Sequence, residues 1–252
     1  MKKVFSRPKS IKPAYFHYCP GCGHSIIHRL IGEVIDEMDI QDKTVGVPPA
    51  GCAVLAYHYF DVDMGEASHG RAAAVATGLK RALPDRIIFT YQGDGDMAAI
   101  GTAEAIHAAA RGEKFTTIFV NNGVYGMTGG QMAPTTLIGQ TTTTSQKGRI
   151  HNRDGFPIHL SEMLALAQGS AYIERTAVNT PSNILKTKRA IAKAFRVQME
   201  GLGFSLVEVL AACPTNWKMT PLQAVKWMED VMMKHFPLGV IKDITGEKKD
   251  AR

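Results

Sequence analysis

The stretch RIIFTYQGDGDMAAIGTAEAIHAAARGEKFTTIFVNN, residues 86–122, contains the pattern that decides the fold. Two runs rich in β-branched and aromatic residues, 86–91 and 115–120, flank a glycine turn and an alanine-rich segment that favours a helix. Strands joined through helices pair in parallel, because the helical crossover returns the chain to the same end of the sheet. The sequence therefore predicts an α/β fold with a largely parallel sheet covered by helices on both faces.

The same alternation of strands and helices continues on both sides of this stretch. Further strands are predicted at 44–47, near 171–174 and at 204–210, and further helices from near Gly23, at 70–83, at 161–168, at 182–200 and from about 221. No linker divides the 252 residues, so we expect a single domain over 1–252, with the motifs inside 15–217 and a C-terminal extension at 218–252. The segment 121–160 is too long for an idle connection and is expected to bind a ligand.

Composition and charge exclude several classes of protein. Hydrophobic residues make up 45% and charged residues 21% of the chain, which argues against disorder. The net charge of +6 is concentrated at the termini and at 186–193 without interleaved aromatic residues, so no nucleic-acid partner is expected. The sequence shows no secretory signal and no apolar run near the roughly 18 residues of a membrane span. We therefore expect a cytoplasmic protein with no membrane span, whose few cysteines are reduced.

The GDGD turn at 93–96 is the first candidate site. Gly93 and Gly95 allow the backbone to turn sharply beside an anion, and the following helix start favours a phosphate. Asp94 offers the hard oxygen ligand that Mg²⁺ prefers. Asn122, after the next strand, offers a second oxygen ligand. Taken by themselves, these residues favour a tight turn that carries an N-capping aspartate and an Asn–Gly turn.

The four cysteines form one close pair, Cys19 and Cys22, and two distant singles, Cys52 and Cys213. Four thiolates can ligate one [4Fe–4S] cluster. The spacing alone also allows a redox-active dithiol, a zinc site or ordinary buried thiols. These interpretations stay open on the cysteines alone.

Several longer motifs, read together, resemble a known family. They are CPGCGH (19–24), AGC (50–52), HGRAAAVATGLKRALPD (69–85), GDGDMAAIGTAEAIHAAARG (93–112), NNGVYGMTGGQMAPTT (121–136) and CPTNW (213–217). Over about residues 15–217 the chain resembles the thiamine-diphosphate-binding beta subunit of 2-oxoacid:ferredoxin oxidoreductases, of the 2-oxoglutarate or 2-oxoisovalerate type. The resemblance implies the thiamine-diphosphate-binding fold.

The resemblance also implies three cofactors and assigns residues to each. Contacts with thiamine diphosphate are implied for Ala50, Gly51, Cys52, Ala53, His69, Gly93, Gly95, Asp96, Gly126, Met127 and Thr128. Mg²⁺ would bind Asp94, Asn122 and the carbonyl of Val124, and a [4Fe–4S] cluster would bind Cys19, Cys22, Cys52 and Cys213. His69 matches a residue at the reacting end of the cofactor and is expected to be catalytic. Other histidines, such as His24 and His28, are expected to be structural.

The implied activity is oxidative decarboxylation of a 2-oxoacid to the acyl-coenzyme A and CO₂, with electrons passing through the cluster to ferredoxin. An alpha subunit is expected to complete the site on the pyrimidine side and to supply the activating glutamate. Gamma and ferredoxin-like delta subunits are further partners that the family allows. The ending CPTNWKMTP favours 2-oxoglutarate or a branched-chain 2-oxoacid over pyruvate. Two alternatives are a non-oxidative thiamine-diphosphate decarboxylase, which needs no cysteines, and a non-enzymatic zinc-binding module.

Overall fold

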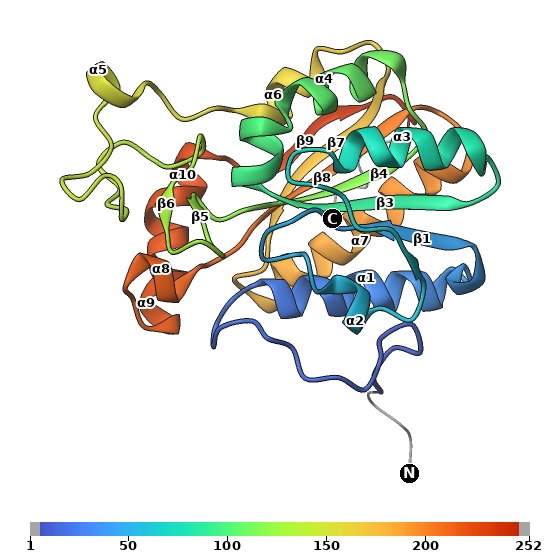
Figure 1. The fold of residues 1–252 in the computed structure, drawn as a ribbon, viewed down its shortest axis with the longest axis horizontal. Coiled ribbons are helices and arrows are strands. Elements are labelled where there is room, and N and C mark those ends of the chain that lie inside the picture. Colours follow the sequence, from blue (N-terminus) through green and yellow to red (C-terminus); the bar gives the residue numbers. More distant parts are fainter. Residues whose placement is uncertain (1–5, 247–252) are drawn as a thin grey trace.

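A seven-stranded sheet forms the centre of the molecule in the computed structural model, which describes residues 6–246 (Figure 1). The strands lie in the order β2-β1-β3-β4-β8-β7-β9, and all neighbours are parallel except β9, which runs antiparallel to β7. Their bounds are β1 (Thr44–Val47), β2 (Asp63–Met64), β3 (Ile87–Gly93), β4 (Thr116–Asn121), β7 (Ser170–Ala177), β8 (Phe204–Leu210) and β9 (Gly239–Asp243). The predicted α/β fold with a largely parallel sheet is confirmed.

Two long helices cover one face of the sheet. Helix α1 (His24–Glu37) buries Ile27, Ile31 and Val34 at helical spacing, and α7 (Pro181–Met199) begins where the hydroxyl of Thr180 caps the first turn. Both helices pack on the apolar side chains of the central strands in one continuous core. The five predicted strands are confirmed, as are these two helices, within a few residues at each end.

The opposite face is covered by α3 (Ala72–Ala82), α4 (Thr102–Arg111) and α6 (Leu160–Ala165) (Figure 1). Alanines such as Ala105 and Ala108 point from α4 to the sheet, and their small side chains let the helix lie close to it. Between β3 and α4 the chain makes one π-helical turn, η2 (Asp96–Ile100). The alanine-rich segments thus form the helices that the sequence predicts.

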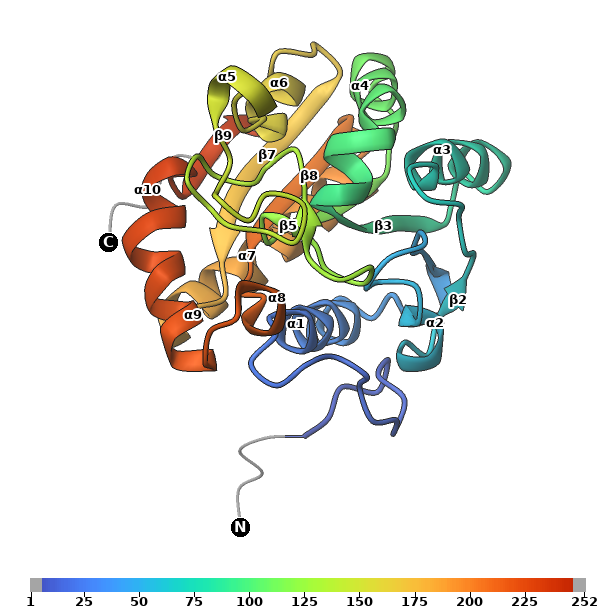
Figure 2. The ribbon, with the colours of Figure 1, turned by 60° about the vertical axis from the view of Figure 1, so that its left-hand side comes forward.

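A third apolar cluster lies beyond the ends of β7 and β8. It joins α8 (Pro214–Trp217), α9 (Pro221–Trp227), η3 (Met228–Met232) and α10 (Met233–His235) to the ends of these strands. Figure 2 shows these helices following one another along one side of the molecule. Residues 218–246, expected as a C-terminal extension, therefore pack on the described core and add β9 to the sheet edge. The division into a single domain stays a prediction.

Several short elements were not predicted from the sequence. They are η1 (Gln41–Lys43), α2 (Ala56–Tyr59), β2, β9, the hairpin of β5 (Val124–Tyr125) and β6 (Gln131–Met132), α5 (His151–Asp154) and α8. Most have five residues or fewer, too short to show a hydrophobic period, and β9 is half exposed on the sheet edge. Among the helices between residues 6 and 246, none has the length and apolar character that crossing a bilayer requires.

Candidate active site

A cavity of about 510 Å³ opens at the carboxyl ends of β1, β3 and β4. Ligands of open parallel sheets bind at this edge, where loops from neighbouring strands converge. The structure brings together here every residue that the sequence assigned to thiamine diphosphate or Mg²⁺. The cavity is lined by His24, Pro49, Ala50, Gly51, Cys52, Ala53, His69, Gly93, Asp94, Gly95, Asp96, Asn122, Val124, Tyr125, Gly126, Met127, Thr128 and Gln131.

Asp94 lies at the end of β3 and is 1% exposed. One carboxylate oxygen accepts from the Gly95 amide at 2.9 Å, and the other accepts from the hydroxyl of Thr135. Burial raises the pKa of Asp94 to about 6, although these hydrogen bonds act in the opposite direction. Within residues 6–246, no lysine, arginine or histidine forms an ion pair with it. A buried carboxylate without a cation suits a divalent metal ion.

Asn122 and Val124 lie on the next strand-end turn. Because Gly93 of β3 pairs with Val120 of β4, the residues that follow the two strands emerge side by side. The Asn122 side-chain oxygen accepts from the Val124 amide at 3.2 Å, and its main-chain carbonyl accepts from the indole of Trp217 at 3.0 Å. The turn is thereby fixed with the Asn122 side chain at the cavity. An amide oxygen beside a buried carboxylate is a chemically suitable pair of magnesium ligands.

The turn at Gly95 requires glycine because of a close approach. A Cβ atom at this position would lie 2.3 Å from the ring of Tyr125, on the β5–β6 hairpin. The missing side chain lets the hairpin close against the GDGD turn, and so forms one wall of the cavity. GDGD therefore forms the tight turn that the sequence allows, and its residues also line the cavity. Binding of a diphosphate and Mg²⁺ at this turn stays a prediction.

His69 is held at the cavity by two acceptors. Its Nδ1 lies 3.0 Å from the carbonyl of Ala50 and 3.1 Å from a carboxylate oxygen of Asp96. The same carboxylate accepts from the amide of Gly70 at 2.5 Å and from Gln92 Nε2 at 2.6 Å. Burial raises the pKa of Asp96, while these hydrogen bonds act to lower it. The Asp96 side chain therefore orients His69. The contact of Asp96 with thiamine diphosphate, which the resemblance implies, stays a prediction.

The four cysteines are all free thiols, and Cys52 lines the cavity wall. Burial, with smaller contributions from the charges of the other cysteine thiolates, raises the pKa of Cys22 and that of Cys52 to about 12 each. Burial also raises the pKa of Cys213, with a smaller contribution from Cys19. The loop of Cys19 and Cys22 lies close to the segment of Cys213, because a Cβ atom on Gly21 would lie 3.3 Å from the side chain of Pro214. Among the described residues, no three histidine, cysteine or acidic side chains form a site for a single metal ion.

Asn216 connects this cysteine region to the cavity. Its Nδ2 donates to the Cys213 sulfur at 3.3 Å and to the Gly126 carbonyl at 2.9 Å. A Cβ atom on Gly126 would lie 2.9 Å from the Cys52 sulfur, so the glycine loop packs directly on that cysteine. Asn216 was not singled out from the sequence, although it belongs to the motif CPTNW.

Arg149 organises the long segment between β6 and α6. The residue is 5% exposed, and its guanidinium donates to main-chain carbonyls, those of Ala133, Pro134, Thr136, Asp154, Gly155 and Phe156. These contacts enclose Thr135, which donates to Asp94. The expectation of a binding segment at 121–160 thus has a structural basis at its first half, since residues 122–131 line the cavity.

Four cavity residues were missed in the sequence: His24, Pro49, Tyr125 and Gln131. Tyr125 and Gln131 fall inside the motif NNGVYGMTGGQ, so their place in that motif was a signal. His24 was expected to be structural, and its Nδ1 does pair with the hydroxyl of Tyr91 at 2.6 Å. It nevertheless also borders the cavity.

The chain matches a family model described as the C-terminal TPP binding domain of thiamine pyrophosphate enzymes, over residues 50–209. The fold and the cavity are thus those of the class of thiamine-diphosphate-binding domains. The ketoisovalerate oxidoreductase subunit VorA of Methanothermobacter marburgensis is 47% identical over 247 residues, which are 98% of this chain and 52% of that protein. The 2-oxoglutarate synthase subunit KorB of Archaeoglobus fulgidus is 37% identical over 213 residues, which are 84% of this chain and 75% of that protein.

A solved 2-oxoglutarate:ferredoxin oxidoreductase from Magnetococcus marinus, with 2-oxoglutarate, coenzyme A and succinyl-CoA bound, aligns with a TM-score of 0.79 at 25% identity. The alignment covers 96% of this chain and 86% of that chain. The chain belongs to the family of thiamine-diphosphate-binding subunits of 2-oxoacid:ferredoxin oxidoreductases. The resemblance found in its motifs is confirmed. The chain spans about half the length of the ketoisovalerate relatives that it matches.

Proposed function

We propose that this chain is the thiamine-diphosphate- and cluster-binding subunit of a cytoplasmic enzyme that oxidatively decarboxylates a 2-oxoacid. The products are the acyl-coenzyme A and CO₂, and the electrons pass through a [4Fe–4S] cluster to ferredoxin. The main support for the proposal is that the GDGD turn, Asn122, His69 and Cys52 all line the same cavity.

The chain's own residues fit Mg²⁺ and a diphosphate. Asp94 and Asn122 would bind the metal ion through side-chain oxygens, and Val124 through its carbonyl. The carboxylate of Asp94 is buried without a cation, which the metal ion would supply. Bound thiamine diphosphate supplies a nucleophilic carbon and an electron sink for decarboxylation. His69, oriented by Asp96, would hold or deliver a proton at the reacting end.

The cysteines fit an iron–sulfur cluster that adjoins this cavity. Cys19, Cys22, Cys52 and Cys213 would be its ligands, and a multiply charged cluster would offset the burial that disfavours their thiolates. Asn216 would donate to the sulfur of Cys213, a contact of the kind that tunes cluster potential.

A partner subunit would complete the site. No glutamate of residues 6–246 lines the cavity, so the activating glutamate would come from an alpha subunit. We propose an obligate complex of at least (αβ)₂, with gamma and ferredoxin-like delta subunits as further components. Coenzyme A and the 2-oxoacid would bind at the shared site. The relatives are named for ketoisovalerate and 2-oxoglutarate, and this favours a branched-chain 2-oxoacid or 2-oxoglutarate over pyruvate.

Turnover of the reconstituted complex tests the proposal. With coenzyme A and a low-potential electron acceptor, we expect CO₂ release from 2-oxoisovalerate or 2-oxoglutarate, and none from the isolated chain. Iron and acid-labile sulfide are measured on the same anaerobic preparation, with about four of each expected per chain. Thiamine-dependent CO₂ release without iron would instead identify a non-oxidative decarboxylase, and bound zinc without thiamine diphosphate would identify a zinc-binding module.

A further inference from the structure

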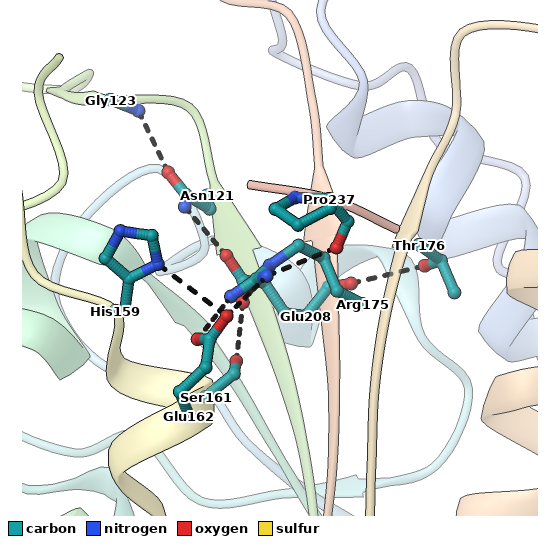
Figure 3. A network of polar contacts seen from close by, with 9 residues as sticks. All are labelled: Asn121, Gly123, His159, Ser161, Glu162, Arg175, Thr176, Glu208 and Pro237. Atoms are coloured by element: carbon teal, nitrogen blue, oxygen red, sulfur yellow. Dashed lines mark hydrogen bonds and ion pairs between the residues drawn. The ribbon is translucent and has the colours of Figure 1, made fainter. Parts of the chain in front are cut away.

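The two consecutive asparagines at the end of β4 point in different directions. Asn122 faces the cavity, whereas Asn121 is fully buried and faces the strand β8. Asn121 Nδ2 donates to Glu208 Oε1 at 2.8 Å, and its Oδ1 accepts from the Gly123 amide at 3.3 Å (Figure 3). Asn121 therefore connects the start of the cavity turn to a buried carboxylate.

That carboxylate has a fixed orientation. Arg175 and Glu208 are partners in the register of β7 and β8, and Arg175 Nε donates to Glu208 Oε2 at 2.8 Å. The hydroxyl of Ser161 donates to the same oxygen. Arg175 is itself held by Glu162, through two bonds of 2.8 and 2.6 Å, and by the carbonyl of Pro237 (Figure 3). Glu208 Oε1 is thus left facing Asn121.

The turn that Asn121 begins depends on such outside support. Gly123 adopts a φ of +69°, and its carbonyl accepts from the hydroxyl of Thr136 at 2.6 Å. The carbonyl of Asn122 accepts from Trp217. These two contacts hold the middle of the turn, and the bond from Asn121 to Glu208 holds its beginning.

We propose that Asn121 and Glu208 are positioning residues that aim the side chain of Asn122 and the carbonyl of Val124 at the metal ion of the cofactor. The inference rests on the proposed function, because it needs the magnesium–diphosphate site. Arg175 and Ser161 act indirectly. They bind one carboxylate oxygen of Glu208, and this leaves the other oxygen to accept from Asn121. Partners that orient metal ligands in this way typically change metal affinity by about 10–100-fold when removed.

An exchange of the two groups tests the geometry. Asn121→Asp places a second carboxylate against Glu208, and we expect it to weaken binding of Mg²⁺ and thiamine diphosphate by about 10–100-fold. Asn121→Asp combined with Glu208→Gln restores one N–H···O bond in the reverse direction and keeps the total charge. The amide oxygen of the introduced glutamine would still accept from Arg175 and Ser161. The double variant is therefore expected to bind within about threefold of the unaltered protein.

Binding is measured by titrating Mg²⁺ and thiamine diphosphate into the full chain, expressed with its partner subunit, and urea unfolding is measured on the same samples. Glu162→Gln is the matched control, because Glu162 binds the same guanidinium but does not touch Asn121; we expect an unchanged affinity. Asn121→Ser is measured in parallel, in case the introduced carboxylate prevents folding. It is expected to weaken binding as well, since serine cannot reach Glu208.

The outcomes separate the two proposals. If the unaltered protein binds the cofactor and Asn121→Asp and Asn121→Ser bind equally well, the positioning role is wrong and the proposed function stands. A double variant that binds no better than Asn121→Asp also overturns the positioning role. A purely structural network would lower the urea midpoint and leave the affinity of the folded protein unchanged. If the unaltered protein does not bind the cofactor, both proposals fall.

Discussion

Asp94 and Glu208 are two carboxylates buried to the same extent, 1% exposed each. Asp94 directly follows β3 and Glu208 lies in β8, and these are the strands on either side of β4. Glu208 has a cation built into the fold, the guanidinium of Arg175, and two further donors. Asp94 has hydrogen-bond donors but, in the described part of the chain, no cationic partner. The fold satisfies one buried charge and leaves the other for a ligand.

The difference supports our proposal that Asp94 binds a ligand directly, whereas Glu208 acts through its contacts within the protein. Burial tends to lower the pKa of Arg175, but the carboxylates of Glu162 and Glu208 outweigh this effect and raise it, so the buried guanidinium is held in its charged form. Burial raises the pKa of Asp94 to about 6, which shows the cost of its charge without a cation. An unsatisfied charge at a cavity is a mark of function, whereas a satisfied one away from it stabilises the frame.

The largest effect is expected for Asp94→Asn. Loss of a first metal ligand should weaken binding of Mg²⁺ and thiamine diphosphate by at least about 100-fold, more than loss of a supporting contact does. The cofactor-free protein should be equally stable or more stable, because a charge buried without a cation has been removed. Cofactor titration and urea unfolding of one preparation give both values.

The exposed Asp85, just before β3, supplies the matched control as Asp85→Asn. Neither affinity nor stability should change in that variant. A marked loss of stability in cofactor-free Asp94→Asn would contradict the comparison, since it would mean that Asp94 has a structural role like that of Glu208.

Glu208→Leu should lower stability, unlike Asp94→Asn. It should also weaken cofactor binding by about 10–100-fold, less than Asp94→Asn does, because Asn121 loses its partner. The substitution leaves the buried guanidinium of Arg175 with only Glu162 as a carboxylate partner, and we expect a loss of about 3 kcal/mol in the free energy of unfolding. The double variant Glu208→Leu with Arg175→Met removes both charges and should recover most of this loss. Denaturant midpoints of the four proteins in this cycle measure the coupling; additive losses would mean that the pair does not act as a unit.

The sequence predicted the sheet well because strands and helices follow from local patterns, whereas most of the cavity residues were implied by the resemblance of the motifs to a family. Strands such as 204–210 are rich in apolar residues, and the glycine motifs mark the points where backbones approach closely. For the pair NN, the resemblance assigned Asn122 to the metal ion but gave Asn121 no role. Neighbouring side chains on a strand point to opposite faces, but which face meets the cavity depends on the register of β4 with β3 and β8.

The sequence also could not show which buried charged side chains have an oppositely charged partner. Arg175 and Glu208 lie 33 positions apart and meet only because β7 and β8 pair. Arg149 and the carbonyls around Thr135 depend in the same way on how a segment without regular structure folds back on itself. Long-range polar contacts carry no sequence period, so the supports of Asp94 and Asn122 emerge only from the structure.

The smallest effect concerns a third buried ionisable group, His28, which avoids the cost of charge by staying neutral. It lies among aromatic rings, and burial, with a smaller contribution from His24, lowers its pKa well below 6.5. The unfolded chain takes up a proton as the pH falls through about 6.5, and the folded chain does not, so the unfolded state binds more protons below that pH. The free energy of unfolding should therefore fall by up to about 1.4 kcal/mol for each pH unit below 6.5, and should not depend on His28 above it.

His28→Phe should flatten this acid slope, because phenylalanine suits the aromatic surroundings and cannot take up a proton. Urea unfolding from about pH 5 to about pH 8 measures the slope, with His107→Gln on the exposed face of α4 as the control. The variant also helps the comparison of Asp94 with Glu208. Any pH dependence of the free energy of unfolding that remains in His28→Phe must come from groups other than His28. An unchanged slope in His28→Phe would show that His28 is protonated in the folded protein, and that burial of this ring does not keep it neutral.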